Sequence, residues 1–206
     1  MNARKAFLAR PNRAAMLRTA AITLGLGVTL VFGYRYVVAT GVEEMASPRP
    51  APAFTHREAA AWINSPPLDL AALRGRVVLL DVWTFDCRNC YRSIPWLTGV
   101  DKTYGPKGLQ LIGVHTPEFD YERVRRNVEQ KIKDFGIVHP VMIDNDYSYW
   151  NALDNQFWPT YYLVDRRGNI RAKYVGEMHA GHARARVIEA KIEELLHEPV
   201  ASGDTR

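Results

Sequence analysis

VVLLDVWTFDCRNC, residues 77–90, runs from an apolar segment into two cysteines, and this stretch decides how the chain folds. The apolar part is rich in β-branched residues, as is typical of a central strand that is buried on both faces of a sheet. The next residues, YRSIPWLTGVDKTYG (91–105), have helical spacing, and we expect Pro95 to bend that helix. The cysteines therefore stand where a strand ends and a helix begins.

Cys87 and Cys90 are the only cysteines among the 206 residues. A disulfide that spans two residues removes little entropy from the unfolded chain, so a purely structural bridge explains them poorly. A closed zinc site needs four ligands, and the chain has no second cysteine pair. His179 and His182 are the histidines that could complete such a site, but we expect no metal and interpret the pair as redox-active.

The position of Cys87 favours a thiolate, because the first N–H groups of a helix are unsatisfied and stabilise negative charge. Cys87 is therefore the expected nucleophile, and Cys90, one turn inside the helix, is the thiol that resolves a mixed disulfide. Arg88 favours the thiolate and Asp86 opposes it. The reduction potential, and with it the direction of electron flow, stays open at this point.

The net charge of +5 originates in the N-terminal segment. Residues 1–42 contain six Lys and Arg and no acidic residue, whereas the other 164 residues contain 21 Lys and Arg against 22 Asp and Glu. A globular part this close to neutral lacks the basic surface that a phosphate backbone requires. We expect no nucleic-acid partner.

The apolar segment TAAITLGLGVTLVFGYRYVVAT, residues 19–40, is long enough to cross a bilayer, with Arg35 near one end. Five cations precede it, which favours a cytoplasmic amino terminus. We expect an uncleaved signal-anchor in the inner (cell) membrane and a catalytic domain on the periplasmic or extracytoplasmic side. A cleaved signal peptide and a buried soluble helix are the alternatives.

Five regions follow from these patterns. They are a basic cytoplasmic arm (1–18), a transmembrane signal-anchor helix (19–40), a Pro/Ala-rich linker (41–53), a folded domain (54–198) and a flexible tail (199–206).

Within the folded domain, strands alternate with helices and a hairpin precedes the last helix. Val124, Val128 and Ile132 form one expected apolar stripe, with Asp120 as the cap and Gly136 as the end of that helix. The expected segments are strands at 76–85, 109–116, 139–144, 160–165 and 170–176, and helices at 91–105, 120–136, 147–154 and 181–197. This order predicts an α/β domain with a mixed sheet and helices on both faces.

VVLLDVWTFDCRNC resembles the active site of the thioredoxin fold, and FWPT (157–160) resembles its cis-proline loop. Gly168 matches the glycine of its hairpin, and Gly176 matches the glycine that follows the next strand. Over roughly residues 60–196, the chain is similar to the redoxins of the TlpA/ResA/DipZ type. The resemblance implies a thioredoxin fold and a protein thiol–disulfide oxidoreductase.

The resemblance also implies roles for individual residues. Asp81, buried in an apolar strand, is expected to have a raised pKa and to exchange a proton with Cys90 through water. A cis Pro159 is expected beside the cysteines, where a substrate chain can pair with the backbone. The implied substrate-binding residues are Trp158, Pro159, Thr160, Arg88 and Asn89, and the implied supporting residues are Trp83 and Pro95.

Other residues around the cysteines carry weaker signals. Many related redoxins have a glutamate where Ser93 stands, so an acid–base role there is not transferred. Thr84 and Cys87 fit the Thr-x-x-Cys of peroxiredoxins, although Asp81 stands where their proline is expected. In the loop HTPEF (115–119), His115 and Glu118 are expected near the rim of the site. His139 is expected to be structural.

We therefore expect a membrane-tethered oxidoreductase that exchanges disulfides with exported proteins, with no cofactor beyond the Cys87–Cys90 disulfide. The resemblance suggests a reductant with a membrane electron donor of thiol–disulfide type and clients such as cytochrome c apoproteins. One alternative is a copper or haem-delivery factor in cytochrome assembly that uses the cysteines and His179 as ligands. The other is a thioredoxin-fold peroxidase.

Overall fold

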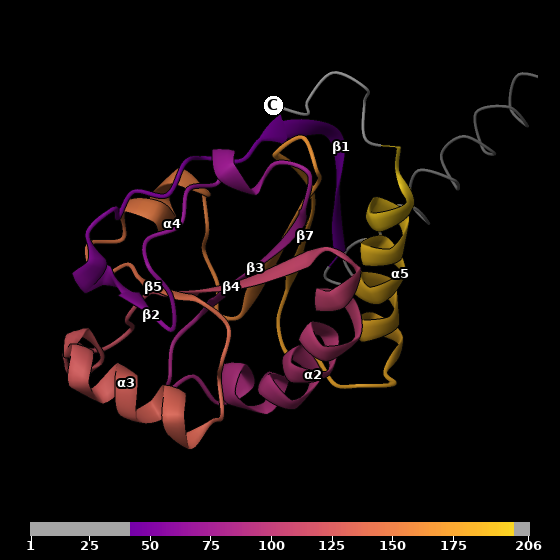
Figure 1. Cartoon of the computed structure of the whole chain (residues 1–206). Helices are drawn as coiled ribbons and strands as arrows, with labels where there is room; N and C mark the ends of the chain where they lie inside the picture. Colours follow the sequence, from indigo (N-terminus) through magenta and orange to yellow (C-terminus); the bar gives the residue numbers. More distant parts are fainter. Residues whose placement is uncertain (1–41, 200–206) are drawn as a thin grey trace, which may run out of the picture. The chain divides into compact units, whose positions relative to one another are not determined.

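The computed structural model describes residues 42–199, which Figure 1 draws in colour. The predicted arm (1–18), membrane helix (19–40) and most of the tail lie outside the described residues. Within residues 42–199, no helix is both long and apolar enough to span a membrane.

One mixed sheet of seven strands forms the centre of the described domain, in the order β1-β7-β6-β3-β4-β5-β2. β3 is parallel to β4 and antiparallel to β6, and each of its seven residues is buried. The central strand predicted from the apolar run is therefore confirmed. The strands are β1 (Val42–Pro50), β2 (Trp62–Ile63), β3 (Val77–Trp83), β4 (Leu109–His115), β5 (Val141–Ile143), β6 (Thr160–Val164) and β7 (Asn169–Val175).

Helices cover both faces of the sheet, as predicted (Figure 1). The odd-numbered side chains of β3, such as Leu79 and Trp83, pack toward α2, α5 and α3, and the even-numbered ones, such as Leu80, pack toward α4 and the segment around Trp62. The helices are α2 (Arg88–Tyr104), α3 (Arg125–Asp134), α4 (Ser148–Ala152) and α5 (Ala183–His197), with short 3-10 helices η1 (Ala59–Ala61), η2 (Ala71–Leu73), η3 (Gly105–Lys107) and η4 (Asp120–Arg123).

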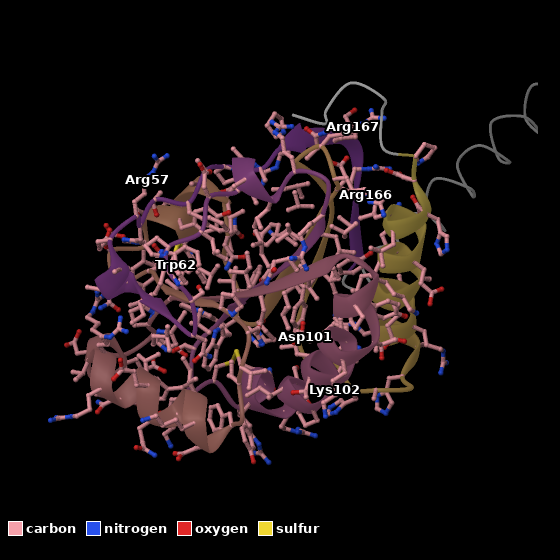
Figure 2. All side chains as sticks on the ribbon, in the orientation of Figure 1. Arg57, Trp62, Asp101, Lys102, Arg166 and Arg167 are labelled. Atoms are coloured by element: carbon pink, nitrogen blue, oxygen red, sulfur yellow. A yellow bond between two sulfur atoms is a disulfide. The ribbon has the colours of Figure 1, made fainter. Side chains whose placement is uncertain are left out.

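The predicted hairpin joins β6 to β7, and Gly168 adopts the positive φ of 82° that the turn requires. Arg166 ties this turn to the end of α5 by donating to the carbonyl oxygens of Leu196 (2.7 Å) and Glu198 (3.2 Å); it is labelled in Figure 2. The C-terminal end of α5 is therefore fixed to the β6–β7 hairpin.

The segment predicted as a linker, 41–53, is mostly part of the sheet. Its residues 42–50 form β1, which pairs antiparallel with β7, and the N–H of Ala51 donates to the carbonyl of Gly168 at 2.9 Å. Prolines are tolerated here because β1 is an edge strand, where a missing N–H need not interrupt a ladder. The ordered domain thus begins before Phe54, and the predicted boundary was wrong.

The helix predicted over residues 120–136 is divided into η4 and α3. Val128 and Ile132 are buried as expected, but Val124 is 43% exposed and is the N-cap of α3. Asp120 therefore does not cap this helix. The chain makes a 3-10 turn first because the Glu122 carboxylate is drawn inward to accept backbone N–H groups.

Candidate active site

The two cysteines lie where β3 gives way to α2, as predicted. Cys87 is the N-cap of α2, and its Sγ accepts a hydrogen bond from the backbone N–H of Cys90 at 3.3 Å. The two residues form a disulfide, with Cα atoms 5.2 Å apart. Cys87 is half-buried and Cys90 is 2% exposed, so an incoming disulfide can reach the first sulfur and not the second.

Asp81 lies in β3 on the face that α2 covers, because it alternates with Leu79 and Trp83. Its side chain is buried, and its Oδ1 atom has no hydrogen-bond partner. Burial raises the pKa of Asp81 to about 8, as expected for a carboxyl group removed from water. A group of this kind can hold a proton at neutral pH and release it slightly above.

The peptide bond between Trp158 and Pro159 is cis, as the resemblance implied. Thr160 pairs in register with Val82 of β3, so this loop lies at the same end of the sheet as Cys87. The Trp158 indole N–H donates to the carbonyl of Thr116 at 3.0 Å, which fixes the half-buried ring at that edge.

Three predicted substrate-binding residues differ in exposure. Thr160 is fully buried, and its hydroxyl donates to the carbonyl of Phe157 at 2.7 Å, so its side chain supports the proline loop and is closed to a substrate. Arg88 and Asn89 are exposed in the first turn of α2, beside Cys87. These two side chains remain accessible to a bound chain.

Trp83 packs beneath the site, in one buried cluster with Phe85, Cys90 and Ile94. Pro95 lies inside α2 and is exposed. Trp83 therefore contacts the buried side of the cysteine pair, and its supporting role stays a prediction.

Ser93, to which no acid–base role was transferred, makes a structural contact. It is fully buried, its hydroxyl donates to the carbonyl of Asn89 at 2.7 Å, and its oxygen accepts the N–H of Met178 at 2.9 Å. It therefore connects α2 to the segment that precedes α5.

Glu122 is a residue of the site region that the sequence did not single out. Its carboxylate is fully buried and accepts the backbone N–H groups of Asp86 (3.0 Å), Glu118 (2.6 Å) and Phe119 (2.8 Å), together with the Thr84 hydroxyl. A glutamate in an amphipathic charged segment gives no sequence signal of burial. The hydroxyl of Thr84, the threonine of the Thr-x-x-Cys motif, donates to Glu122 and so helps to hold this carboxylate in place.

In the loop HTPEF, Glu118 is exposed and His115 is buried, so only Glu118 reaches the surface. His115 ends β4 with its ring buried between Trp83 and Phe85, and burial lowers its pKa to about 4. It is neutral and lies below the rim. His139 is likewise buried, and burial lowers its pKa to about 4.

The histidines proposed as possible ligands do not join the cysteines. His179 pairs with Glu177, and its ring centroid lies 5.1 Å from that of His182. In residues 42–199, the one group of three potential ligands within 4.8 Å is His56, Asp144 and Asp146. That group contains no cysteine.

The His56 group is accounted for by hydrogen bonds. His56 Nε2 lies 3.1 Å from Asp144, whose carboxylate also accepts the N–H groups of Tyr149 and Trp150 at the start of α4. These contacts tie the segment before β2 to the start of α4, on the same face of the sheet.

Comparison with known proteins agrees with this geometry. The redoxin family profile matches residues 47–192. DipZ of Mycobacterium bovis is 39% identical over 140 residues, which cover 66% of this chain and 19% of DipZ. The thiol-disulfide oxidoreductase YkuV of Bacillus subtilis is 22% identical over 150 residues, covering 73% of this chain and 96% of YkuV.

Among solved structures, a thiol-disulfide isomerase from Corynebacterium glutamicum superimposes with a TM-score of 0.61 at 24% identity. The match covers 72% of this chain and 98% of the isomerase, and it shows the shared thioredoxin fold. The chain thus matches whole small redoxins, but only about a fifth of the length of DipZ.

Proposed function

The chain belongs to the redoxin family, and from that premise we propose that it is a protein thiol–disulfide oxidoreductase whose working group is the Cys87–Cys90 pair. One observation carries the proposal: an accessible sulfur caps a helix while its partner is buried one turn behind. This asymmetry separates a nucleophile from a resolving thiol.

In the reduced protein, the Cys87 thiolate attacks one sulfur of a substrate disulfide. The substrate disulfide breaks, its second sulfur leaves as a thiolate that takes up a proton, and a mixed disulfide forms at Cys87. The Cys90 thiolate then attacks the Cys87 sulfur and releases the remaining substrate thiol. Two electrons pass to the substrate, and the Cys87–Cys90 disulfide is left behind.

Three groups would assist these steps. The N–H of Cys90 and the start of α2 stabilise negative charge on Cys87, and the exposed Arg88 adds to this effect. Asp81, on the face of β3 under α2, would accept the Cys90 proton through water. The cis-proline loop with Trp158 would hold the substrate backbone beside Cys87. No cofactor beyond the cysteine pair is required.

We further propose that the domain is tethered to the inner membrane by residues 19–40 and works on the extracytoplasmic side. The support is the apolar length of that segment and the five cations that precede it. In an oxidising compartment a reductant needs a supply of electrons, so a membrane donor of thiol–disulfide type and exported protein clients, cytochrome c apoproteins among them, complete the proposal.

The reduction potential of the Cys87–Cys90 pair tests the reductive role. A reduction potential of about −270 mV supports a reductant, whereas one of about −120 mV makes the protein an oxidant. Copper titration of the reduced protein tests the delivery alternative, since stoichiometric binding would favour it over the oxidoreductase.

A further inference from the structure

A groove opens beside Cys87 on a side of the site that includes no residue of the cis-proline loop. It consists of two pockets of about 280 Å³ and about 420 Å³. Phe85, Asp86, Cys87 and Arg88 line the first, and Ile94, Pro95 and His179 are among the residues that line the second. Tyr91 and Phe135 line both pockets, which are therefore adjacent.

Tyr91 and Phe135 form the apolar floor of this groove. Their ring centroids are 5.0 Å apart, and they come from the first turn of α2 and the end of α3. Tyr91 is 54% exposed, although most large aromatic side chains of the described domain are buried. Phe135 is half-buried, so Tyr91 is the exposed member of the pair, and an exposed aromatic side chain beside a reactive sulfur is typical of a surface that contacts a partner.

Several charged groups around the groove have partners outside it, and Arg88, at the Cys87 end, is exposed. Arg92 pairs with Glu177 at 3.1 Å, and Asp134 accepts a hydrogen bond from Gln130 at 2.8 Å. Lys131 lies over the Phe135 ring, 5.9 Å from its centroid. The groove therefore offers apolar contact more than a free charge, and an uncharged apolar side chain fits it best.

The remaining exposed aromatic side chains of the described domain also come from segments around the site. Phe119 and Tyr121 belong to the loop that Glu122 anchors to Asp86, and Phe157 precedes the proline loop. Such a surface matches a polypeptide that has not yet buried its own apolar side chains.

We propose that the groove binds an apolar, preferably aromatic, side chain of the incompletely folded polypeptide whose disulfide Cys87 attacks. This inference rests on the proposed function and adds a substrate class to it. Because Cys87 itself lines the first pocket, a chain joined to that sulfur enters the groove directly. Cys87 and Pro95 are eight residues apart along α2, or about 12 Å, which about four residues of an extended chain span.

The test uses the full chain, reduced beforehand, and matched pairs of synthetic peptides, each joined to glutathione by a disulfide. The peptides differ in carrying Phe or Ser at positions within four residues of the cysteine. In a single turnover, we expect the second-order rate constant to be about tenfold higher for the best Phe peptide than for its Ser partner. Tyr91→Ala and Phe135→Ala should move this ratio toward one.

Val138→Ser is the matched control, because Val138 is 75% exposed and lines neither pocket, so the ratio should stay at the wild-type value. Tyr91→Ala keeps the test valid if Phe135→Ala unfolds, since Tyr91 is exposed on a helix. A wild-type ratio of one, a Tyr91→Ala ratio equal to wild type, or a dimer that covers the groove would overturn the inference. Failure to reduce either peptide would instead contradict the proposed function.

Discussion

The Glu122 carboxylate accepts the backbone N–H of Asp86 at 3.0 Å, across 36 residues of sequence. Asp86 immediately precedes Cys87, so a buried acid on one loop fixes the residues that lead into the reactive sulfur. The two oxygens of this carboxylate accept four hydrogen bonds, three from backbone N–H groups and one from the Thr84 hydroxyl.

Glu122→Gln should destabilise the domain. A glutamine has one acceptor oxygen, and its NH2 group would face backbone N–H groups that also need an acceptor. Leaving a buried donor unpaired costs about 1–3 kcal/mol, and we expect a loss of about that size in the free energy of unfolding, measured with urea. Glu118→Gln, at an exposed side chain, is the control and should change little. Equal stabilities for the two variants would show that the anchor is unimportant.

Cys90→Ala should accumulate a mixed disulfide between Cys87 and its substrate. The resolving thiol is then absent, while the accessible sulfur still attacks. Non-reducing electrophoresis and mass spectrometry after mixing with an oxidised protein would detect the adduct. Cys87→Ser should form none, because Cys90 is buried. An adduct on Cys90 in that variant would reverse the assigned order.

Asp81→Asn should remove one step from the pH dependence of disulfide exchange. Burial raises the pKa of Asp81 to about 8, so we expect the resolving step of the wild-type protein to accelerate as pH rises through about 8. The rate of this step, measured by stopped flow between pH 6 and pH 10, should show no such inflection in the variant. A profile identical to wild type would exclude Asp81 as the proton acceptor.

Because its pKa is raised by burial, Asp81 should also lower the free energy of unfolding as pH rises. Its pKa in the folded state lies above that of the unfolded chain, so unfolding releases a proton between about pH 4 and about pH 8. The free energy of unfolding should fall by about 1.4 kcal/mol for each pH unit in this window. Urea unfolding of the disulfide form at several pH values checks this, and Asp81→Asn should flatten the slope.

His56 should also make the domain less stable as pH rises, but over a different pH range. Burial alone lowers the pKa of His56, but its hydrogen bond to Asp144 and the charge of Asp146 raise the net value above 6.5. The stabilisation is therefore complete below the pKa of the unfolded chain and is lost as pH rises through the folded pKa. His56→Gln should reduce stability more at pH 5.5 than at pH 9, with His197→Gln, at a separate surface histidine, as the control. An equal loss at both pH values would contradict the ion pair.

Much of the site could be predicted from local sequence. An apolar β-branched run followed by a cysteine and an amphipathic pattern specifies a buried strand and a helix, and so sets Cys87 at the helix start and Cys90 behind it. The hairpin around Gly168 follows from the same kind of short-range signal.

Other features depend on contacts that no local pattern reports. The residues read as a linker became β1 because β7 offered an unpaired edge, and prolines alone do not reveal a neighbouring strand. Glu122 is buried because backbone donors from two loops meet there, although its sequence context is that of a surface residue.

The sequence by itself determined the order of the five inner strands and of the main helices, but not the edge strands β1 and β2, and it determined the place of the reactive pair along the chain, since periodicity and turn residues act over a few positions. Only the tertiary structure decided which distant groups meet: Glu122 with Asp86, and Tyr91 with Phe135 beside Cys87. Periodicity specifies the face that a residue presents, but the packing of the layers selects its partner.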